Sequence, residues 1–383
     1  MTRLRSAGMM LAFFACICGA GAQTVTLTVR NPLPEALAAQ TVEVPWAQIA
    51  ALAPALQPTQ VRMVDDAGTP MVTQAVDRDG DGRADLLLLQ TDLAPAQIKT
   101  FHLSAGEPAP AASRVFGRFV PERYDDFAWE NDRVAFRMYG KALETHPTEP
   151  LTSSGVDVWC KRTRDLIINK WYQAGTYHTD HGEGLDAYTV GTSRGCGGVA
   201  VVRDGQRFVS RNFRSWRVVA NGPLRVEFIL HYEPWDAGGV MISEEKRISL
   251  DAGQNLSHFE SVFTTDPPGA PFQVAVGIAI HQPTADVSLA PDAGTMRVWE
   301  DAGKSGKVGC SAVFPADGLQ AMTREAGHAW ALLTAKDRAP VSYWAGFGWD
   351  KSGDFADMAA WDAYLAAFAR RVRNPVQVTV SAG

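Results

Sequence analysis

Short runs in which hydrophobic and polar residues alternate recur along almost the whole chain. Near the N-terminus, Val25, Leu27 and Val29 alternate with threonines, which is the two-residue period of a strand with one buried face. Residues 355–373 instead show the longer period of an amphipathic helix, with three arginines near its end, where the helix dipole favours positive charge. The pattern therefore predicts a mainly β protein with a C-terminal helix.

Two β-sandwiches are expected, because a chain of 383 residues is longer than most single domains. Residues 23–106 suggest about seven short strands and a short helix near 47–56, typical of a small immunoglobulin-like sandwich. Residues 107–113 have the composition of a linker. Residues 114–383 predict a large antiparallel supersandwich of two sheets, followed by the helix and a final strand at 376–380.

The first 22 residues have the features of a cleavable signal peptide. Two arginines precede an apolar run at about residues 9–17, and the small residues at 20 and 22 suit a signal peptidase. The run is shorter than the roughly 20 residues that cross a bilayer, and a retained anchor is the alternative. We therefore expect a secreted protein, periplasmic or extracellular, with no membrane attachment after cleavage.

The charge and the cysteines limit the partners and the covalent bonds of the exported part. The net charge is −6 and there is no basic run, which argues against nucleic acid as a partner. Cys160, Cys196 and Cys310 remain after the signal, so at most one disulfide can form, and the sequence does not say which residues would pair. No organic cofactor is indicated, and the oligomeric state is not predicted.

Residues 77–85 read Asp-Arg-Asp-Gly-Asp-Gly-Arg-Ala-Asp, with carboxylates at alternating positions. Oxygen ligands spaced in this way converge on a hard cation such as Ca²⁺. Leu88 stands where a full EF-hand has its bidentate glutamate, so we expect a hairpin loop that holds a structural calcium ion. The alternative is an acidic turn that binds nothing. The expected ligands are Asp77, Asp79, Asp81 and Asp85.

Residues 159–197 combine many titratable groups with aromatic residues. A packed strand would not carry so many, because each needs a partner once it is desolvated. Aromatic faces beside charged groups are typical of a concave sugar site. His181 and Glu183 are the catalytic candidates for acid/base work, since they share one face if the segment is extended. The substrate-binding candidates are His178, Arg194, Lys161, Lys170, Trp171, Tyr172, Asp186 and Tyr188.

Within this set, Lys161, Lys170 or Arg194 would neutralise a uronate carboxylate, and Trp171 and Tyr172 would stack on a sugar ring. Sugar binding without turnover and a polar contact between domains remain alternatives. So does a zinc or manganese site, although the spacing is not that of a helical zinc motif; its ligands would be His178, His181, Glu183 and Asp186.

Two further polar groups lie outside this segment. His258 and Glu260 share one face of a predicted strand, and His258 is expected either in a hydrogen-bonded core position or in a groove with Glu260 beside it. The other group is expected to line the same cleft as residues 159–197. It consists of Asp125, Asp126, Glu130 and Asn131 near Arg118 and Arg123.

Several motifs resemble those of the domain-of-unknown-function family 4861. The most specific is His-Gly-Glu-Gly-Leu-Asp at residues 181–186, and others lie at 116–118, 122–131 and 343–349. The resemblance covers nearly the whole mature chain. It implies an exported bacterial protein, often encoded among genes for the degradation of pectin-like polysaccharides. It also implies a second domain similar to the galactose-mutarotase-like supersandwich, and it brings no established catalytic residues.

Together these features predict a secreted carbohydrate-active protein, an enzyme of the lyase or glycoside hydrolase type, that acts on acidic, pectin-like oligosaccharides. The alternative is a non-catalytic glycan-binding protein that uses the same groove. In both cases the partner is an oligo- or polysaccharide.

Overall fold

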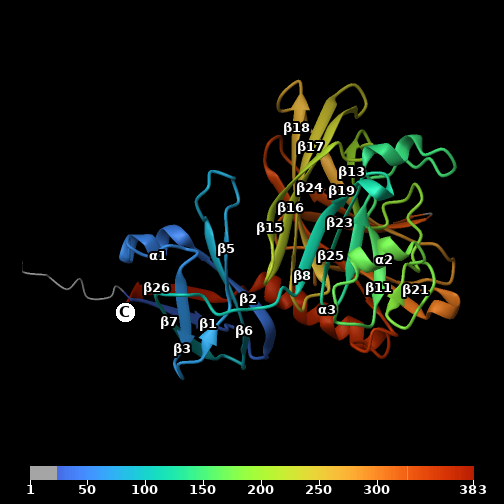
Figure 1. The fold of residues 1–383 in the computed structure, drawn as a ribbon. Helices are drawn as coiled ribbons and strands as arrows, with labels where there is room; N and C mark the ends of the chain where they lie inside the picture. Colours follow the sequence, from blue (N-terminus) through green and yellow to red (C-terminus); the bar gives the residue numbers. More distant parts are fainter. Residues whose placement is uncertain (1–23, 326) are drawn as a thin grey trace, which may run out of the picture.

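The computed structural model describes residues 24–325 and 327–383, so the signal peptide expected at residues 1–22 lies outside the described residues. A small and a large β-sandwich lie side by side (Figure 1). Neighbouring strands in the sheets of both are antiparallel, as the two-residue hydrophobic period predicts. None of the described helices is long and apolar enough to cross a membrane.

The small sandwich packs a five-stranded sheet against a three-stranded sheet. Val25, Leu27 and Val29 are buried in its core while the threonines between them are half-buried, as their alternation predicts. The helix α1 (Trp46–Leu52) adds Ile49 to this core. The larger sheet runs in the order β26 (Gln377–Ala382), β1 (Val25–Arg30), β7 (Ile98–Ala105), β3 (Val61–Asp65) and β4 (Pro70–Met71), and the smaller one β2 (Leu37–Pro45), β6 (Leu86–Leu93) and β5 (Thr73–Val76).

The C-terminal strand belongs to the small sandwich. β26 pairs with β1 from Val25, opposite Ala382, to Arg30, opposite Gln377. The sequence instead predicts a single second domain that continues to residue 383. The two-residue period reports which face of a strand is buried and does not report which strand lies beside it, so the partner of β26 could not be predicted.

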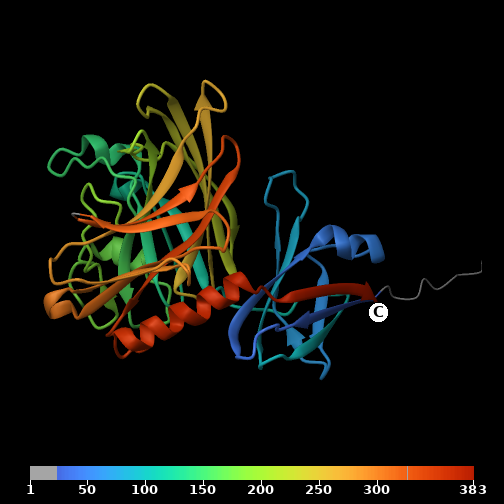
Figure 2. The ribbon, with the colours of Figure 1, turned by 180° about the vertical axis from the view of Figure 1, so that it is seen from behind.

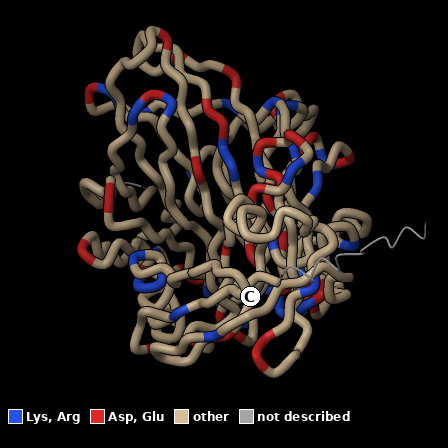
Figure 3. The backbone as a smooth tube through the Cα atoms, turned by 90° about the vertical axis from the view of Figure 1, so that its left-hand side faces the viewer, with Lys and Arg blue, Asp and Glu red and all other residues tan. Residues whose placement is uncertain are grey.

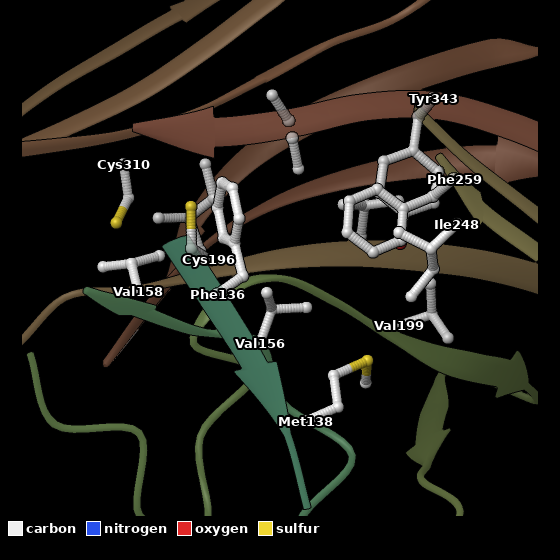
Figure 4. Packing of buried hydrophobic residues seen from close by; sticks show 14 of the residues in the cluster. Phe136, Met138, Val156, Val158, Cys196, Val199, Ile248, Phe259, Cys310 and Tyr343 are labelled. Carbon is white, nitrogen blue, oxygen red and sulfur yellow. The ribbon is translucent and has the colours of Figure 1, made fainter. Parts of the chain in front are cut away.

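The large sandwich encloses the main hydrophobic core. Phe136, Cys196 and Tyr343 lie in it, and Figure 4 shows their packing. Cys160 and Cys310 are buried too, and all three of these thiols are free, so no disulfide occurs among the described residues.

Three sheets build the large sandwich. The eight-stranded sheet runs β15 (Ser215–Asn221), β16 (Arg225–Asp236), β17 (Met241–Asp251), β18 (Leu256–Asp266), β25 (Pro340–Trp349), β22 (Lys307–Val313), β21 (Thr295–Asp301) and β20 (Asp286–Ala290). A five-stranded sheet runs β14 (Gln206–Phe208), β13 (Cys196–Arg203), β19 (Gln273–Ala279), β24 (His328–Thr334) and β23 (Leu319–Glu325). The other five-stranded sheet runs β12 (Gly184–Leu185), β11 (Asp157–Lys161), β10 (Ala135–Met138), β9 (Asp126–Asn131) and β8 (Val115–Val120). Short 3-10 helices lie at Pro121–Arg123, Lys141–Thr145 and Gly303–Ser305.

The expected C-terminal helix is α3 (Met358–Arg373), which lies along the large sandwich before the chain crosses to the small one (Figure 2). Asp357 caps its first turn through its side chain. Trp361 is fully buried against the large sandwich, and Arg370 near the other end pairs with Glu35 of the small sandwich. The helix therefore contacts both sandwiches.

Polar contacts join the two sandwiches. Gln74 of β5 donates to the carbonyl of Arg225, and Arg78 in the next loop pairs with Glu227 at 3.0 Å and Glu260 at 2.7 Å. Figure 3, which views the molecule from the side of the small sandwich, shows acidic and basic residues interspersed along the chain. The contact therefore depends on charge pairs as well as on packing.

Candidate functional site

A group of charged side chains lies on the outer face of the sheet that contains β8 to β12. Asp126, Arg137 and Asp157 come from the neighbouring strands β9, β10 and β11, on the face opposite to the main core. The helix α2 (Ile168–Ala174) and the loop after it cover this face, where they pack on Trp159. Because of this cover, all three charged side chains are buried.

Arg137 contacts three carboxylates at the centre of the group. Its Nε donates to Asp157 Oδ2 at 2.6 Å, its Nη2 donates to Asp186 Oδ2 at 3.1 Å, and its Nη1 lies 3.6 Å from Asp126 Oδ2. Burial raises the pKa of Asp126 to about 7 and holds the pKa of Asp186 well above its usual range. One guanidinium does not balance three acids out of water, so the group retains a proton near neutral pH.

Two tyrosine hydroxyls donate hydrogen bonds to these carboxylates. Tyr139 donates to Asp157 Oδ2 at 3.1 Å, and Tyr172 donates to Asp126 Oδ2 at 3.2 Å. The other oxygen of Asp126, Oδ1, is buried and has no hydrogen-bond partner among the described residues. Protonation at this oxygen would relieve the cost of burying an unpaired charge.

Arg123 brings a second guanidinium to the edge of the group. Its Nε donates to the Tyr177 hydroxyl at 2.8 Å, and Arg137 Nη1 donates to the same oxygen at 3.4 Å. The carboxylate paired with Arg123 is that of Glu149, at 3.5 Å and largely exposed. Solvent weakens such an exposed pair, so Arg123 keeps most of its charge available to a ligand.

A cavity of about 350 Å³ opens onto these residues, and His178 lines it. The Nδ1 of His178 lies 3.5 Å from Asp186 Oδ2, and 64% of the His178 side chain is exposed. A carboxylate beside Nδ1 orients the ring and leaves Nε2 for a ligand. We call this cavity the Arg137 pocket. Its lining residues are Arg123, Arg137, Tyr139, Leu143, Glu149, Pro150, Leu151, His178, Asp186, Tyr188, Thr189, Val190 and Gly191.

His181 and Glu183 do not line the Arg137 pocket. His181 is exposed, and its Nε2 lies 3.1 Å from Thr176 Oγ1. Glu183 accepts from Lys170 at 2.6 Å and from the indole of Trp171 at 3.4 Å, and the hydrogen bond from Lys170 lowers the pKa of Glu183. No hydrogen bond or ion pair joins His181 to Glu183 in the described part of the chain.

Lys161 and Arg194 are buried and have partners inside the protein. Lys161 Nζ donates to Glu130 Oε2 at 2.7 Å. Arg194 donates to Ser154 Oγ at 2.9 Å, and burial lowers the pKa of Arg194 to about 10. Neither cation lines the Arg137 pocket, so neither is placed to meet a ligand there.

The remaining binding candidates divide between the pocket and its support. His178, Asp186 and Tyr188 line the pocket. Tyr172 lies behind it, with its hydroxyl on the buried carboxylate of β9. Trp171 is buried and stacks on the tryptophan of β11 with ring centroids 5.6 Å apart.

The loop at residues 77–85 brings metal-ligand side chains together. Ligand oxygens of Asp77, Asp79 and Asp85 lie within 4.8 Å of one another, and no other set of three or more such side chains meets among the described residues. The histidine-containing set considered for zinc or manganese therefore does not form. Asp81 is outside the set, and its Oδ1 accepts a hydrogen bond from the backbone N–H of Arg83 at 2.8 Å. Three carboxylates on a hairpin suit a hard cation.

Sequence reasoning did not single out Arg137, Asp157 or Tyr139. A signal is present, because Arg137 is the one charged residue of the strand Ala-Phe-Arg-Met. A charge in the middle of a short apolar strand requires a buried partner of opposite sign. Asp126 was expected near the cleft of residues 159–197, and it contacts Arg137 there.

Comparison with known proteins places this chain among relatives. Residues 29–378 match the family described as "Domain of unknown function (DUF4861)". The uncharacterized protein P7 of Formosa agariphila is 37% identical over 338 residues, which cover 83% of this chain and 84% of that protein. A solved structure of a protein in the glycosyl hydrolase family 38 from Enterococcus faecalis is similar over 94% of this chain, with a TM-score of 0.54 and 9% identity. This chain spans 47% of that structure, and the likeness shows the fold alone.

Proposed function

Because this chain belongs to the DUF4861 family and shares the fold of part of a glycosyl hydrolase family 38 protein, we propose that it is an exported carbohydrate-active enzyme that acts on acidic oligosaccharides. The observation that carries the proposal is the Arg137 pocket. Its lining includes both His178, which has a buried carboxylate beside Nδ1, and the available cation of Arg123. An acid/base group beside a carboxylate-binding group is what a uronate substrate requires.

The reaction that these side chains suit is β-elimination. Arg123 pairs with the carboxylate of the uronate, which makes the proton on the adjacent carbon 5 more acidic. Nε2 of His178 takes this proton, its electron pair forms the double bond between carbons 4 and 5, and the bond from carbon 4 to the leaving oxygen breaks. His178 then returns the proton to that oxygen, so atoms and charges balance. The net negative charge of the acids around Arg137, of which Asp186 lies beside Nδ1, stabilises the imidazolium that forms between the two transfers.

This assignment selects among the sequence candidates by position. His178 lines the cavity, whereas His181 and Glu183 do not and instead contact Thr176 and Lys170. Lys161 and Lys170 pair with glutamates and do not line the cavity, whereas Arg123 does, so Arg123 takes the role of the carboxylate-binding cation.

Turnover of pectic and other uronic oligosaccharides tests the proposal. Ultraviolet absorbance follows the new double bond, and a reducing-end assay follows all bond cleavage. We expect both signals from the wild type, with a loss of about 10²- to 10⁴-fold in His178→Ala. The matched control is His181→Ala, which removes a histidine three positions away and should keep its activity.

Other outcomes assign the function differently. Full activity of His178→Ala together with loss in His181→Ala would move the acid/base role to His181. Reducing ends without absorbance would indicate a glycoside hydrolase. Calorimetric binding with neither signal would indicate a glycan-binding protein.

A structural calcium ion in the loop at residues 77–85 belongs to the same proposal. It is supported by the three converging carboxylates and by Arg78 within the loop, which pairs with Glu227 and Glu260 of the large sandwich. An ion would fix the loop and with it this contact. Export directed by residues 1–22 would expose the loop to the calcium outside the cytoplasm.

A further inference from the structure

A second cavity, of about 450 Å³, lies between the two sandwiches and shares no lining residue with the Arg137 pocket. One wall is the face of the eight-stranded sheet that points away from the core, and the opposite wall comes from β2, α3 and β26. Small-molecule sites have volumes of roughly 300–1,000 Å³, so the cavity can hold a ligand of that size. We call it the interdomain cleft.

His258 and Trp344 form an aromatic wall in the interdomain cleft. They are direct cross-strand neighbours on β18 and β25, and their rings stack with centroids 4.3 Å apart and an interplanar angle of 13°. Nε2 of His258 lies 2.7 Å from Ser342 Oγ, and its Nδ1 has no partner among the described residues. Burial lowers the pKa of His258, so its ring is neutral at neutral pH. The wall is therefore uncharged and keeps one free hydrogen-bonding atom.

The arginines of the cleft differ in their charge partners. Arg225 is paired with Asp251 and with Glu43, each at 2.6 Å. Arg371 donates to Gln254 Oε1 at 2.7 Å, and no carboxylate pairs with it in the part of the chain that the structure describes. Arg371 therefore supplies a positive charge to the cleft that no neighbouring side chain neutralises.

We infer that the interdomain cleft binds one acidic sugar unit of a glycan. Arg371 pairs with the carboxylate of this unit, and the sugar ring lies along the aromatic wall. Asp251 and Glu43 accept from its hydroxyls, since Arg225 pairs with both carboxylates and keeps them in place. The inference that the ligand carries a carboxylate rests on Arg371, whereas the inference that the ligand is a sugar rests on the proposed function.

Calorimetric titration with digalacturonate and with its dimethyl ester tests this inference. All titrations use the His178→Ala background, which prevents the proposed turnover and leaves the cleft intact. Arg371→Gln should weaken digalacturonate binding about 10- to 100-fold, because a charge-assisted hydrogen bond is lost. The ester should bind weakly to the protein that keeps Arg371. The matched control is Arg370→Gln, which changes the preceding arginine of α3 and should keep full affinity.

A further variant separates the two cavities. Arg123→Gln removes the cation of the Arg137 pocket and should leave binding in the interdomain cleft unchanged, whether or not the wild type turns over any substrate. Arg371→Lys keeps the charge and should restore much of the affinity that Arg371→Gln loses, which distinguishes a lost contact from a damaged fold.

Four results would overturn the inference. These are equal affinities of Arg371→Gln and Arg370→Gln, equal binding of ester and acid, loss of binding in Arg123→Gln alone, and no binding of digalacturonate at all. Only the third result supports the Arg137 pocket at the same time, so failure of the inference and failure of the proposed function can be told apart.

Discussion

Replacement of Asp126 by asparagine measures the charge balance around Arg137. In the native state burial raises the pKa of Asp126 from its usual 3.8 to about 7. Each factor of ten in proton affinity is worth about 1.4 kcal/mol. The difference between the native and unfolded states therefore corresponds to about 4 kcal/mol of stability.

The sign follows from which state holds the proton. Below pH 4 Asp126 is protonated in both states. Between pH 4 and pH 7 the unfolded chain releases the proton while the native protein retains it. The free energy of unfolding therefore falls as the pH rises. Above pH 7 both states have released it and the contribution is constant. An asparagine does not titrate, so Asp126→Asn loses this part of the pH dependence.

Urea denaturation between pH 4 and pH 8 is the assay. The free energy of unfolding of Asp126→Asn minus that of the wild type should rise by about 4 kcal/mol over this range. Asp165→Asn, which removes a carboxylate at an exposed position outside this group, is the matched control. A difference for Asp126→Asn that stays flat over this range would show that Asp126 holds no proton in the native state, and the charge argument for the group would fail.

Three further predictions concern a buried ion pair, the loop at residues 77–85 and a glycine of β12. Lys161→Met leaves a buried carboxylate unpaired and should lower the free energy of unfolding by about 3–5 kcal/mol. Lys170→Met removes an exposed pair and should lower it by less than about 1 kcal/mol. Similar losses in the two variants would refute the burial argument. Chelator should lower the melting temperature of the wild type and leave that of Asp79→Ala unchanged. If chelator does not change the melting temperature of the wild type, a structural ion is excluded. Gly184→Ala should destabilise the fold strongly, because the new Cβ would lie 1.9 Å from a carbonyl oxygen of β11 at a φ of +124°, whereas Gly182→Ala meets no atom within 4 Å and should cost less.

The two-residue period was sufficient to predict the fold class. It identified several strands of each sandwich, and the helical stripe at 355–373 identified α3 because Trp361, Leu365 and Phe368 are buried on one side of it. It did not place β26, whose partner β1 is at the opposite end of the chain. Strand pairing between distant segments depends on the three-dimensional path of the chain, and local patterning carries no record of it.

The segment at 159–197 shows where reasoning about the site reached its limit. The expectation that His181 and Glu183 share a face requires an extended chain. The structure instead places α2 and a series of turns there, and only Gly184 and Leu185 form a strand. Glycines with positive φ at 182 and 184 redirect the chain between these elements. His178, Asp186 and Tyr188 of this segment line the Arg137 pocket, and the turn geometry decides that His178 rather than His181 meets the cavity.

A high density of titratable residues is therefore weak evidence for an active site. Most such side chains between 159 and 197 have partners within the protein: Lys161 pairs with Glu130, and Glu183 pairs with Lys170. Ion pairs of this kind occur in a layer that only covers a sheet as well as in a binding site. What separates the Arg137 pocket from this background is imbalance, because three buried acids there share one buried guanidinium. A stable fold has no need of such an excess charge, which costs free energy unless a proton or a ligand offsets it. The same criterion draws attention to Arg371, a cation in a cleft without an acid beside it.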